Sequence, residues 1–259
     1  MNALKRHEKI MEILIERKEI GVGELSSLLD VTGKTIREDL ARLEEKGLLV
    51  RVHGGAMLAQ NDQFGILSAR GAAGRHAPEK AEIAARALRY IQPGDIVALD
   101  GGGTTLEMAR QLENVPLTVV TNDLFILSEL AHKDKIRLVV PGGERVRNVL
   151  IGTGSAEFVS GLNISKAFLS ATALHPELGA SIYTGDLVPY KKALVKTARQ
   201  VFGVVEHQKF GKFALWTFAD CSELDVIVTD RGIDPAQKTL FAQKNIRLDD
   251  GSGERQHQG

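Results

Sequence analysis

Several features that define common protein classes are scarce or missing in this sequence. Cys221 is the only cysteine among 259 residues, which excludes an internal disulfide and a paired-cysteine metal or redox site. No apolar run approaches the roughly 20 residues of a membrane helix, and the N-terminus lacks the apolar core of a signal peptide, so we expect a cytoplasmic protein without a membrane partner. The 33 basic residues balance 33 acidic ones, so any affinity for nucleic acid must come from a local surface.

The first 58 residues carry the pattern of three short helices followed by a β-hairpin. Apolar residues at helical spacing predict helices around residues 10–14 and 25–29. Thr32 suits the N-cap of a third helix that ends near Gly47. The apolar side of this third helix consists of residues spaced i, i+4 and i+7, namely Ile36, Leu40 and Leu43. The alternation in "LLVRVHGGAML" then predicts the hairpin, closed by two glycines.

Three short helices and a hairpin in under 60 residues indicate a winged helix-turn-helix, which binds DNA. With Ile36 on the buried side, steps of 100° per residue turn the charged residues of the third helix outwards, towards a major groove. Residues 1–58 hold ten basic and ten acidic residues, so a solvated helix face is the alternative interpretation. The candidate DNA contacts are Thr32, Lys34, Thr35, Arg37 and Arg42 from the helix, and Arg51 and His53 from the wing.

The remaining sequence predicts a linker, an α/β domain and a tail. Residues 59–78 are rich in glycine and alanine without a sustained period, as is typical of a linker. Over residues 79–248 helical segments alternate with short apolar strands, which predicts a largely parallel sheet covered on both faces. The expected strands are "DIVALD", "LTVVTN", "IRLVVPG", "KAFLSA", "VFGVVE" and "DVIVTD". We expect the polar residues 249–259 to form a disordered tail.

A glycine–threonine loop lies between the first of these strands and the following helix. Its residues are Asp100, Gly101, Gly102, Gly103, Thr104 and Thr105. Glycines allow close approach to the backbone, and the amides and hydroxyls at a helix start suit a phosphate or another anion. The loop is no nucleotide fingerprint, because Leu106 stands where GxGxxG requires its third glycine and no GK[ST] follows. An ordinary glycine turn is the alternative interpretation.

Further polar residues follow other predicted strands. Since open α/β sheets bind ligands at the carboxyl ends of their strands, we expect these residues to share one edge. Donors and cations gathered there indicate an anionic ligand rich in hydroxyl groups, such as a sugar phosphate. We expect no cofactor, no metal and no catalytic residue. The additional candidates for effector binding are Thr121, Asn122, Gly142, Gly143, Arg147 and Lys209.

The segment "VTGKTIREDLARLEEKGLLVRVHGGA" resembles the N-terminal signature of the DeoR family of bacterial transcriptional regulators. The matching elements are Thr35-Ile36-Arg37, Asp39-Leu40, Leu43-Glu44 and His53-Gly54-Gly55-Ala56. The sequence departs from the signature at Glu38, where the family commonly has a second basic residue. An acidic side chain there repels phosphate and is suited instead to accept a hydrogen bond from a cytosine or a neighbouring arginine.

The second half of the chain resembles the DeoR-type sensor domain, which is similar to the sugar-phosphate isomerase fold. The resemblance includes the loop from Asp100 to Thr105, the pair Thr121-Asn122, and Gly142-Gly143 followed by Arg147. A Val-Lys-Arg-Ala-Met-like helix of the family corresponds to "YKKAL", which implies that Lys191 and Lys192 join the effector pocket. The family's Asp-Ser-Ser-Lys-Phe-Gly corresponds to "EHQKFG", in which Glu206, His207 and Gln208 replace the smaller residues.

Residues and resemblance together predict a DNA-binding transcriptional regulator, a repressor of a carbohydrate-metabolism operon that a phosphorylated sugar controls. Its partners would be double-stranded operator DNA, the sugar phosphate and further copies of the chain in a dimer or tetramer. One alternative is a sugar-phosphate isomerase with an accessory domain, although "LSATALHP" offers no carboxylate where such enzymes supply theirs. Another alternative is a sensor for a nucleotide or a partner protein.

Overall fold

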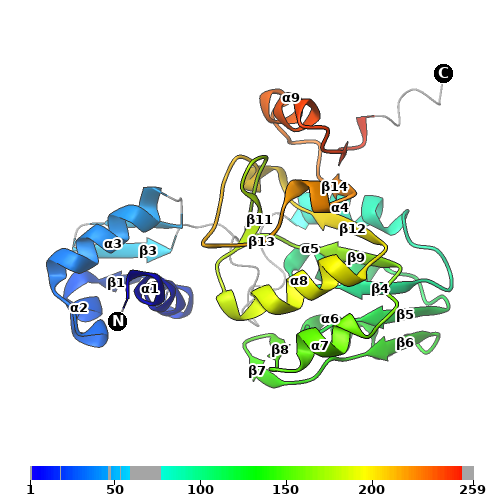
Figure 1. Cartoon of the computed structure of the whole chain (residues 1–259), viewed down its shortest axis with the longest axis horizontal. Coiled ribbons are helices and arrows are strands. Elements are labelled where there is room, and N and C mark those ends of the chain that lie inside the picture. Colours follow the sequence, from blue (N-terminus) through cyan, green and yellow to red (C-terminus); the bar gives the residue numbers. More distant parts are fainter. Residues whose placement is uncertain (1, 18, 46–47, 53, 59–76, 253–259) are drawn as a thin grey trace. The chain divides into compact units, whose positions relative to one another are not determined.

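In the computed structural model the chain forms two compact units, Met1–Phe64 and Gly65–Gly259, each of which is described by itself (Figure 1). The structure describes residues 2–17, 19–45, 48–52, 54–58 and 77–252. The division between the units falls inside the expected linker, residues 59–78. Most of that linker lies outside the described residues, and helix α4 already begins at its end, at Ala77.

The first unit contains the three predicted helices and the predicted hairpin. Its elements are α1 Ala3–Arg17, β1 Glu19–Gly21, α2 Val22–Leu29, α3 Gly33–Glu45, β2 Leu49–Val52 and β3 Gly55–Leu58. Strand β1 was not predicted, because three residues are too few to show a period of two; it pairs antiparallel with β3 in the sheet order β1-β3-β2. The core is formed by fully buried apolar residues from all three helices, among them Ile10, Leu14, Leu25, Ile36, Leu40 and Leu43.

A buried carboxylate ties α3 to α1. Asp39 on α3 is only 2% exposed, and it accepts hydrogen bonds from Nε and Nη2 of Arg6 at 2.5 and 3.1 Å. Its other contact is with Nε2 of His7, 2.8 Å away. Arg6 and His7 both belong to α1, so this cluster fixes the rotation of α3 about its own axis.

The second unit is built on a seven-stranded sheet in which every pairing is parallel, in the order β15-β14-β12-β9-β4-β5-β6 (Figure 1). Six of these strands were predicted, and their bounds are β4 Ile96–Leu99, β5 Leu117–Val120, β6 Ile136–Val139, β9 Lys166–Leu169, β12 Gln200–Val204 and β14 Val226–Val228. None of the helices in the described part of the chain is long and apolar enough to cross a membrane.

Helices cover both faces of the sheet, as predicted. Along β4, Val97 and Leu99 belong to one core and Ala98 to the other, because successive side chains point to opposite faces. The first core lies under α4 Ala77–Leu88, α5 Gly103–Gln111 and α6 Leu124–Leu130. The second lies under α7 Ser155–Ser160, α8 Val188–Thr197 and α9 Pro235–Gln243.

Two smaller antiparallel sheets and three short 3-10 helices were not predicted. The first sheet is the hairpin of β7 Glu144–Val146 and β8 Val149–Ile151. The second has the order β10-β11-β13 and consists of Ala173–His175, Gly179–Ile182 and Trp216–Ala219. The 3-10 helices are η1 Gly185–Leu187, η2 His207–Lys209 and η3 Cys221–Glu223. Figure 1 shows the β7–β8 hairpin beside α7, at one end of the large sheet.

The expected disordered tail needs a correction at its start. Strand β15, Leu248–Asp249, pairs in parallel with β14 at the edge of the sheet. Tyr90 donates a hydrogen bond to Oδ2 of Asp249 at 2.8 Å, and Lys238 Nζ lies 2.6 Å from Oδ2 of Asp250. Polar composition alone misses this segment, because backbone pairing and side-chain contacts order it. Residues 253–259 lie outside the described part of the chain.

We expect Asp39→Asn to destabilise the protein by about 2–4 kcal/mol, because the substitution leaves Arg6 without its buried countercharge. Urea unfolding of the full-length protein, followed by circular dichroism, measures the change. Glu12→Gln is the control, since Glu12 and Lys9 form an exposed pair 3.4 Å apart, and it should cost under about 0.5 kcal/mol. Equal stability of the two variants would contradict the structural role of the buried pair.

Candidate DNA-binding surface and effector site

Helix α3 presents its charged residues on the side opposite to its core contacts. The helix starts at a capping residue, because Oγ1 of Thr32 accepts a hydrogen bond from the backbone N–H of Thr35 at 3.2 Å. Lys34, Arg37 and Arg42 are exposed, whereas Thr35 is half-buried. The outward side that the sequence analysis assigned to DNA is therefore accessible within this unit.

The wing is attached to the same helix. The backbone N–H of Arg51 on β2 donates to Oε1 of Glu44 on α3 at 2.8 Å, and the guanidinium of Arg51 lies 3.9 Å from Oε2 of the same carboxylate. Arg51 is exposed, so it remains accessible to a DNA phosphate. His53, the other wing candidate, lies outside the described residues.

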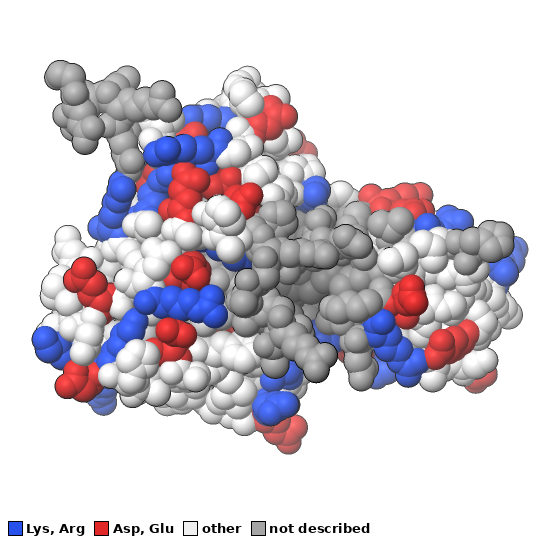
Figure 2. All heavy atoms as spheres, turned by 180° about the vertical axis from the view of Figure 1, so that it is seen from behind, with Lys and Arg blue, Asp and Glu red and all other residues white. Residues whose placement is uncertain are grey.

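Neither sign of charge predominates on the face that Figure 2 shows. Figure 2 shows Lys and Arg side chains interspersed with Asp and Glu on the visible face of each unit. On α3 the exposed Glu38 stands beside Arg37. Attraction to DNA must therefore come from a few placed cations rather than from a broad basic field.

In the second unit, the ends of β4 and β9 meet at a buried ion pair. Asp100 directly follows β4, and Lys191 on α8 forms a direct ion pair with its Oδ2. Ser170 follows β9 and donates to the same carboxylate from its backbone N–H at 3.1 Å and from its hydroxyl at 3.2 Å. Nζ of Lys191 also donates to the carbonyl oxygen of Ser170 at 2.9 Å. All three residues are at most 5% exposed.

A second buried charge cluster surrounds Glu206, just beyond the end of β12. Oε1 accepts from the hydroxyl of Thr104 and lies close to Nζ of Lys80, both at 3.2 Å, while Nζ of Lys209 lies 2.8 Å from Oε2. Burial raises the pKa of Glu206, but the ammonium groups of Lys209 and Lys80 outweigh this effect and lower the pKa to about 2. Glu206 is therefore ionised at neutral pH and holds the two lysines in place.

The two clusters are electrostatically connected. Burial lowers the pKa of Lys191 while the charge of Asp100 raises it, and the positive charge of Lys209 adds to the lowering. The glycine loop runs between the clusters, from Asp100 to Thr104 at the start of α5. A Cβ on Gly102 would lie 2.5 Å from Oγ of Ser170, so only glycine permits this close approach.

Other predicted residues stabilise the loops at the carboxyl edge of the sheet, because their hydroxyls are bonded within the protein or because they are glycines in tight turns. The hydroxyl of Thr105 donates to the carbonyl oxygen of Gly102 at 2.9 Å, and that of Thr121 accepts from the backbone N–H of Asp123 at 3.2 Å. Gly103 is the first residue of α5. Gly142 has φ of 76°, and a Cβ on Gly143 would lie 2.4 Å from the backbone of Ile151.

Asp123, next to Asn122, was not among the predicted residues. Its Oδ1 accepts from the backbone N–H groups of Phe125 and Ile126 at 2.8 and 3.1 Å, which caps α6. Its Oδ2 accepts from Nδ2 of Asn148 at 2.5 Å. Burial raises the pKa of Asp123 to about 6 despite these hydrogen bonds, and the charge of Asp100 adds to the increase.

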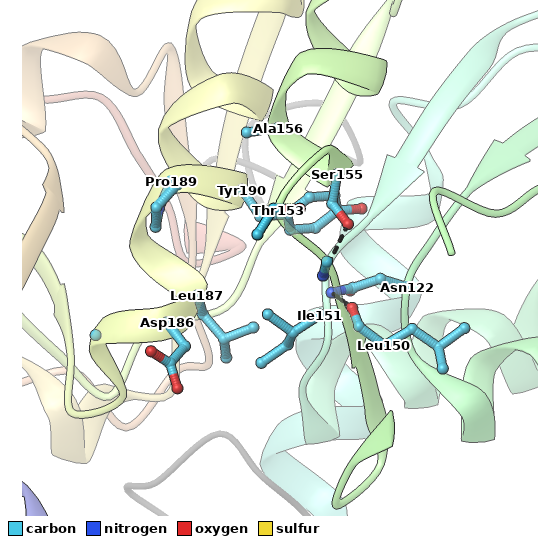
Figure 3. A pocket seen from close by; sticks show the side chains of 12 residues that line it. Asn122, Leu150, Ile151, Thr153, Ser155, Ala156, Asp186, Leu187, Pro189 and Tyr190 are labelled. Atoms are coloured by element: carbon cyan, nitrogen blue, oxygen red, sulfur yellow. Dashed lines mark hydrogen bonds between the residues drawn. The ribbon is translucent and has the colours of Figure 1, made fainter. Parts of the chain in front are cut away.

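A pocket of about 310 Å³ is lined by Tyr190, the neighbour of Lys191 on α8, and the charge of Asp100 acts on this tyrosine (Figure 3). Tyr190 on α8 and Asn122 after β5 line it, together with residues of β8, α7 and η1. Within the described residues, neither the hydroxyl of Tyr190 nor Oδ1 of Asn122 has a hydrogen-bond partner, although both atoms are buried. The other lining residues are Leu150, Ile151, Gly152, Thr153, Ser155, Ala156, Gly185, Asp186, Leu187 and Pro189.

The structure brings most of the predicted effector residues to the carboxyl edge of the parallel sheet, but not all of them. Lys192 is exposed on α8, whereas its neighbour Lys191 is buried. Arg147 is half-buried in the turn of the β7–β8 hairpin, with φ of 58°. Lys80 was not among the predicted residues. It stands three residues before Ile83 and four before Ala84, on the apolar side of its helix, and that position was the available signal.

Two family models match the chain in succession. Residues 6–62 match the "DeoR-like helix-turn-helix domain", and residues 75–231 match the "DeoR C terminal sensor domain". The protein belongs to the DeoR family. It is a DNA-binding transcriptional regulator, and the DeoR-type helix-turn-helix places the DNA-binding function in the first unit.

Curated relatives match along most of their length. The "HTH-type transcriptional repressor GlcR" of Bacillus subtilis (strain 168) is 30% identical, over 92% of this chain and 93% of the relative. The "Transcriptional repressor AccR" of Agrobacterium fabrum is 32% identical, over 88% and 89%. Among solved structures, ribose 5-phosphate isomerase A from Methanocaldococcus jannaschii matches 51% of this chain and 53% of its own with a TM-score of 0.37 and 16% identity.

We expect Glu206→Gln to lower the stability of this DeoR-family protein by on the order of 3 kcal/mol at pH 7. The native pKa of about 2 lies below the ordinary 4.5, so the stabilisation is present above about pH 4.5 and is lost as the pH falls towards 2. Urea unfolding of both proteins between pH 3 and 7 should show the difference shrinking with acidification. Glu177→Gln, at an exposed pair with Lys244, serves as the control. A difference that is independent of pH would contradict the assigned charge state.

Proposed function

We propose that this regulator is a repressor whose affinity for operator DNA is controlled by a phosphorylated sugar bound at the carboxyl edge of the parallel sheet. The observation that carries the proposal is the gathering of three buried lysines, Lys80, Lys191 and Lys209, around the start of α5. Two relatives, GlcR and AccR, are named transcriptional repressors, which supports repression as the mode of control.

The chemistry of this edge favours an anionic ligand. Lys80, Lys191 and Lys209 face the carboxylates of Asp100 and Glu206, so the two clusters carry an excess of positive charge. Ammonium groups, backbone amides at a helix start and hydroxyls are the donors that proteins use for phosphate. The cations are already held in position by Asp100 and Glu206, so a phosphate meets an ordered site.

Control of DNA binding requires the ligand to distinguish two arrangements of the protein. A sugar phosphate that bound both the DNA-competent and the incompetent arrangement equally would leave repression unchanged. We propose a homo-oligomer that places two α3 helices on half-sites one helical turn of DNA apart, or a multiple of one turn. Release from DNA then follows when the ligand favours an arrangement with a different spacing of these helices.

Three buried carboxylates at the sheet edge are poorly suited to act as the base that the isomerase alternative requires. Asp100 is paired with Lys191, and Glu206 is held by Lys80 and Lys209 with a pKa of about 2. Asp123 has a pKa of about 6, but both of its oxygens accept hydrogen bonds from fixed donors. A general base needs a free oxygen within reach of the substrate carbon, so binding is favoured over turnover. Conversion of pentose or hexose phosphates by the purified protein would restore the enzyme hypothesis.

The double substitution Lys34→Ala and Arg37→Ala should weaken binding to the DNA upstream of the regulated operon by at least about 100-fold, since it removes two exposed cations from each α3. A mobility shift at several salt concentrations measures the loss and should show a smaller dependence on salt. The matched control is Lys5→Ala with Lys9→Ala, two exposed cations on α1. Comparable losses in both double variants would show that α3 has no special role.

The effector is tested by thermal unfolding of the full-length protein with a panel of pentose, hexose and hexitol phosphates. A ligand at about 100 times its dissociation constant should stabilise the native state by about 2.7 kcal/mol. The same ligand should change the affinity for DNA in a mobility shift. Lys209→Met should abolish the stabilisation because it removes a buried cation. Lys192→Met is the matched control: it removes an exposed lysine of the predicted set and should leave the stabilisation in place. Stabilisation by a nucleotide, and by no sugar phosphate, would replace the proposed ligand.

A further inference from the structure

The pocket that Tyr190 and Asn122 line holds two buried polar atoms that the proposed phosphate site does not use. Asn122 is 1% exposed, and its Nδ2 donates to the carbonyl oxygen of Leu150 at 3.0 Å, which leaves Oδ1 as an acceptor facing no donor in the described part of the chain. Tyr190 is 4% exposed, and its hydroxyl is likewise unpartnered there. Buried polar groups are nearly always hydrogen-bonded, so two of them on one pocket indicate a missing partner.

The two groups come from different elements and are held firmly. Figure 3 shows Tyr190 on α8 and Asn122 at the end of β5 among the side chains that line the pocket. The amide of Asn122 is oriented by its hydrogen bond to Leu150. Burial and the charge of Asp100 raise the pKa of Tyr190, so its phenol is neutral and able to donate.

The lining of the pocket favours a neutral group over a phosphate. None of its twelve residues is a lysine, arginine or histidine, and Asp186 adds an exposed carboxylate. A phosphate dianion has acceptors only, so it would meet the acceptor of Asn122 and the charge of Asp186 with no cationic side chain in the lining to balance them. A sugar hydroxyl both donates and accepts, so hydroxyl groups can satisfy Asn122 and Tyr190 together.

We propose that this pocket receives the unphosphorylated end of the sugar, and that Tyr190 and Asn122 determine specificity by hydrogen bonding to its hydroxyl groups. The inference rests on the proposed function, because the phosphate must be held by the neighbouring lysine clusters.

Tyr190→Phe tests the proposal in the full-length protein. The unliganded variant should melt at the same temperature as the wild type or higher. The removed hydroxyl makes no hydrogen bond within the described residues, so its loss breaks none of them. The variant's affinity for the sugar phosphate that stabilises the wild type most should fall about tenfold, while its affinity for inorganic phosphate stays unchanged. Tyr90→Phe is the matched control: it removes a hydroxyl that donates to Asp249, so it should melt lower and bind the sugar phosphate normally.

A second variant tests the pocket by its volume. Ala156→Leu on α7 adds a side chain at the lining and should weaken binding of the same sugar phosphate without affecting inorganic phosphate. Unchanged sugar-phosphate affinity in both Tyr190→Phe and Ala156→Leu would overturn the inference while leaving the proposed function intact. A melting temperature of unliganded Tyr190→Phe as low as that of Tyr90→Phe would also overturn it, because the hydroxyl would then have a structural partner such as a bound water. If no sugar phosphate stabilises the wild type, the proposed effector fails and this inference fails with it.

Discussion

Buried charge at the carboxyl edge of the parallel sheet is the constraint on which the second unit depends. Strands β4, β9 and β12 pair in parallel, so Asp100, Ser170 and Glu206 follow them at one edge. Cations stabilise the buried carboxylates of Asp100 and Glu206, and Lys80, Lys191 and Lys209 supply them from α4, α8 and η2. We propose that the same cations also receive the anionic ligand, in which case one arrangement serves both stability and recognition.

Much of the architecture could be predicted because it is encoded locally. Strands buried on both faces appear as short apolar runs, and all six strands predicted for the second unit lie in the parallel sheet. Seven of the described strands escaped prediction. Five of them, β1, β7, β8, β10 and β15, have only two or three residues, too few to show an alternation, whereas β11 and β13 have four each. Their pairing is decided by tertiary contacts.

The candidate site was predictable in type but not in its pairings. The glycine–threonine loop and Lys209 could be identified from strand ends, whereas the hydrogen bond between Thr104 and Glu206 spans 102 residues and leaves no local signal. From the sequence, Glu206 was interpreted only as a larger side chain beside Lys209; in the structure it is the carboxylate that pairs with Lys80 and Lys209. In the first unit, Asp39 plays a comparable part by fixing the side of α3 that carries Lys34 and Arg37.

We propose above all that ligand binding at the sheet edge and DNA binding by α3 are thermodynamically coupled. Titration calorimetry of the most stabilising sugar phosphate, into the free protein and into its operator complex, tests this coupling most directly. The ligand should bind the operator complex more weakly than it binds the free protein. Thermodynamic linkage requires this factor to equal the factor by which the ligand lowers the protein's affinity for DNA. Equal ligand affinities for the free and the DNA-bound protein would contradict the account.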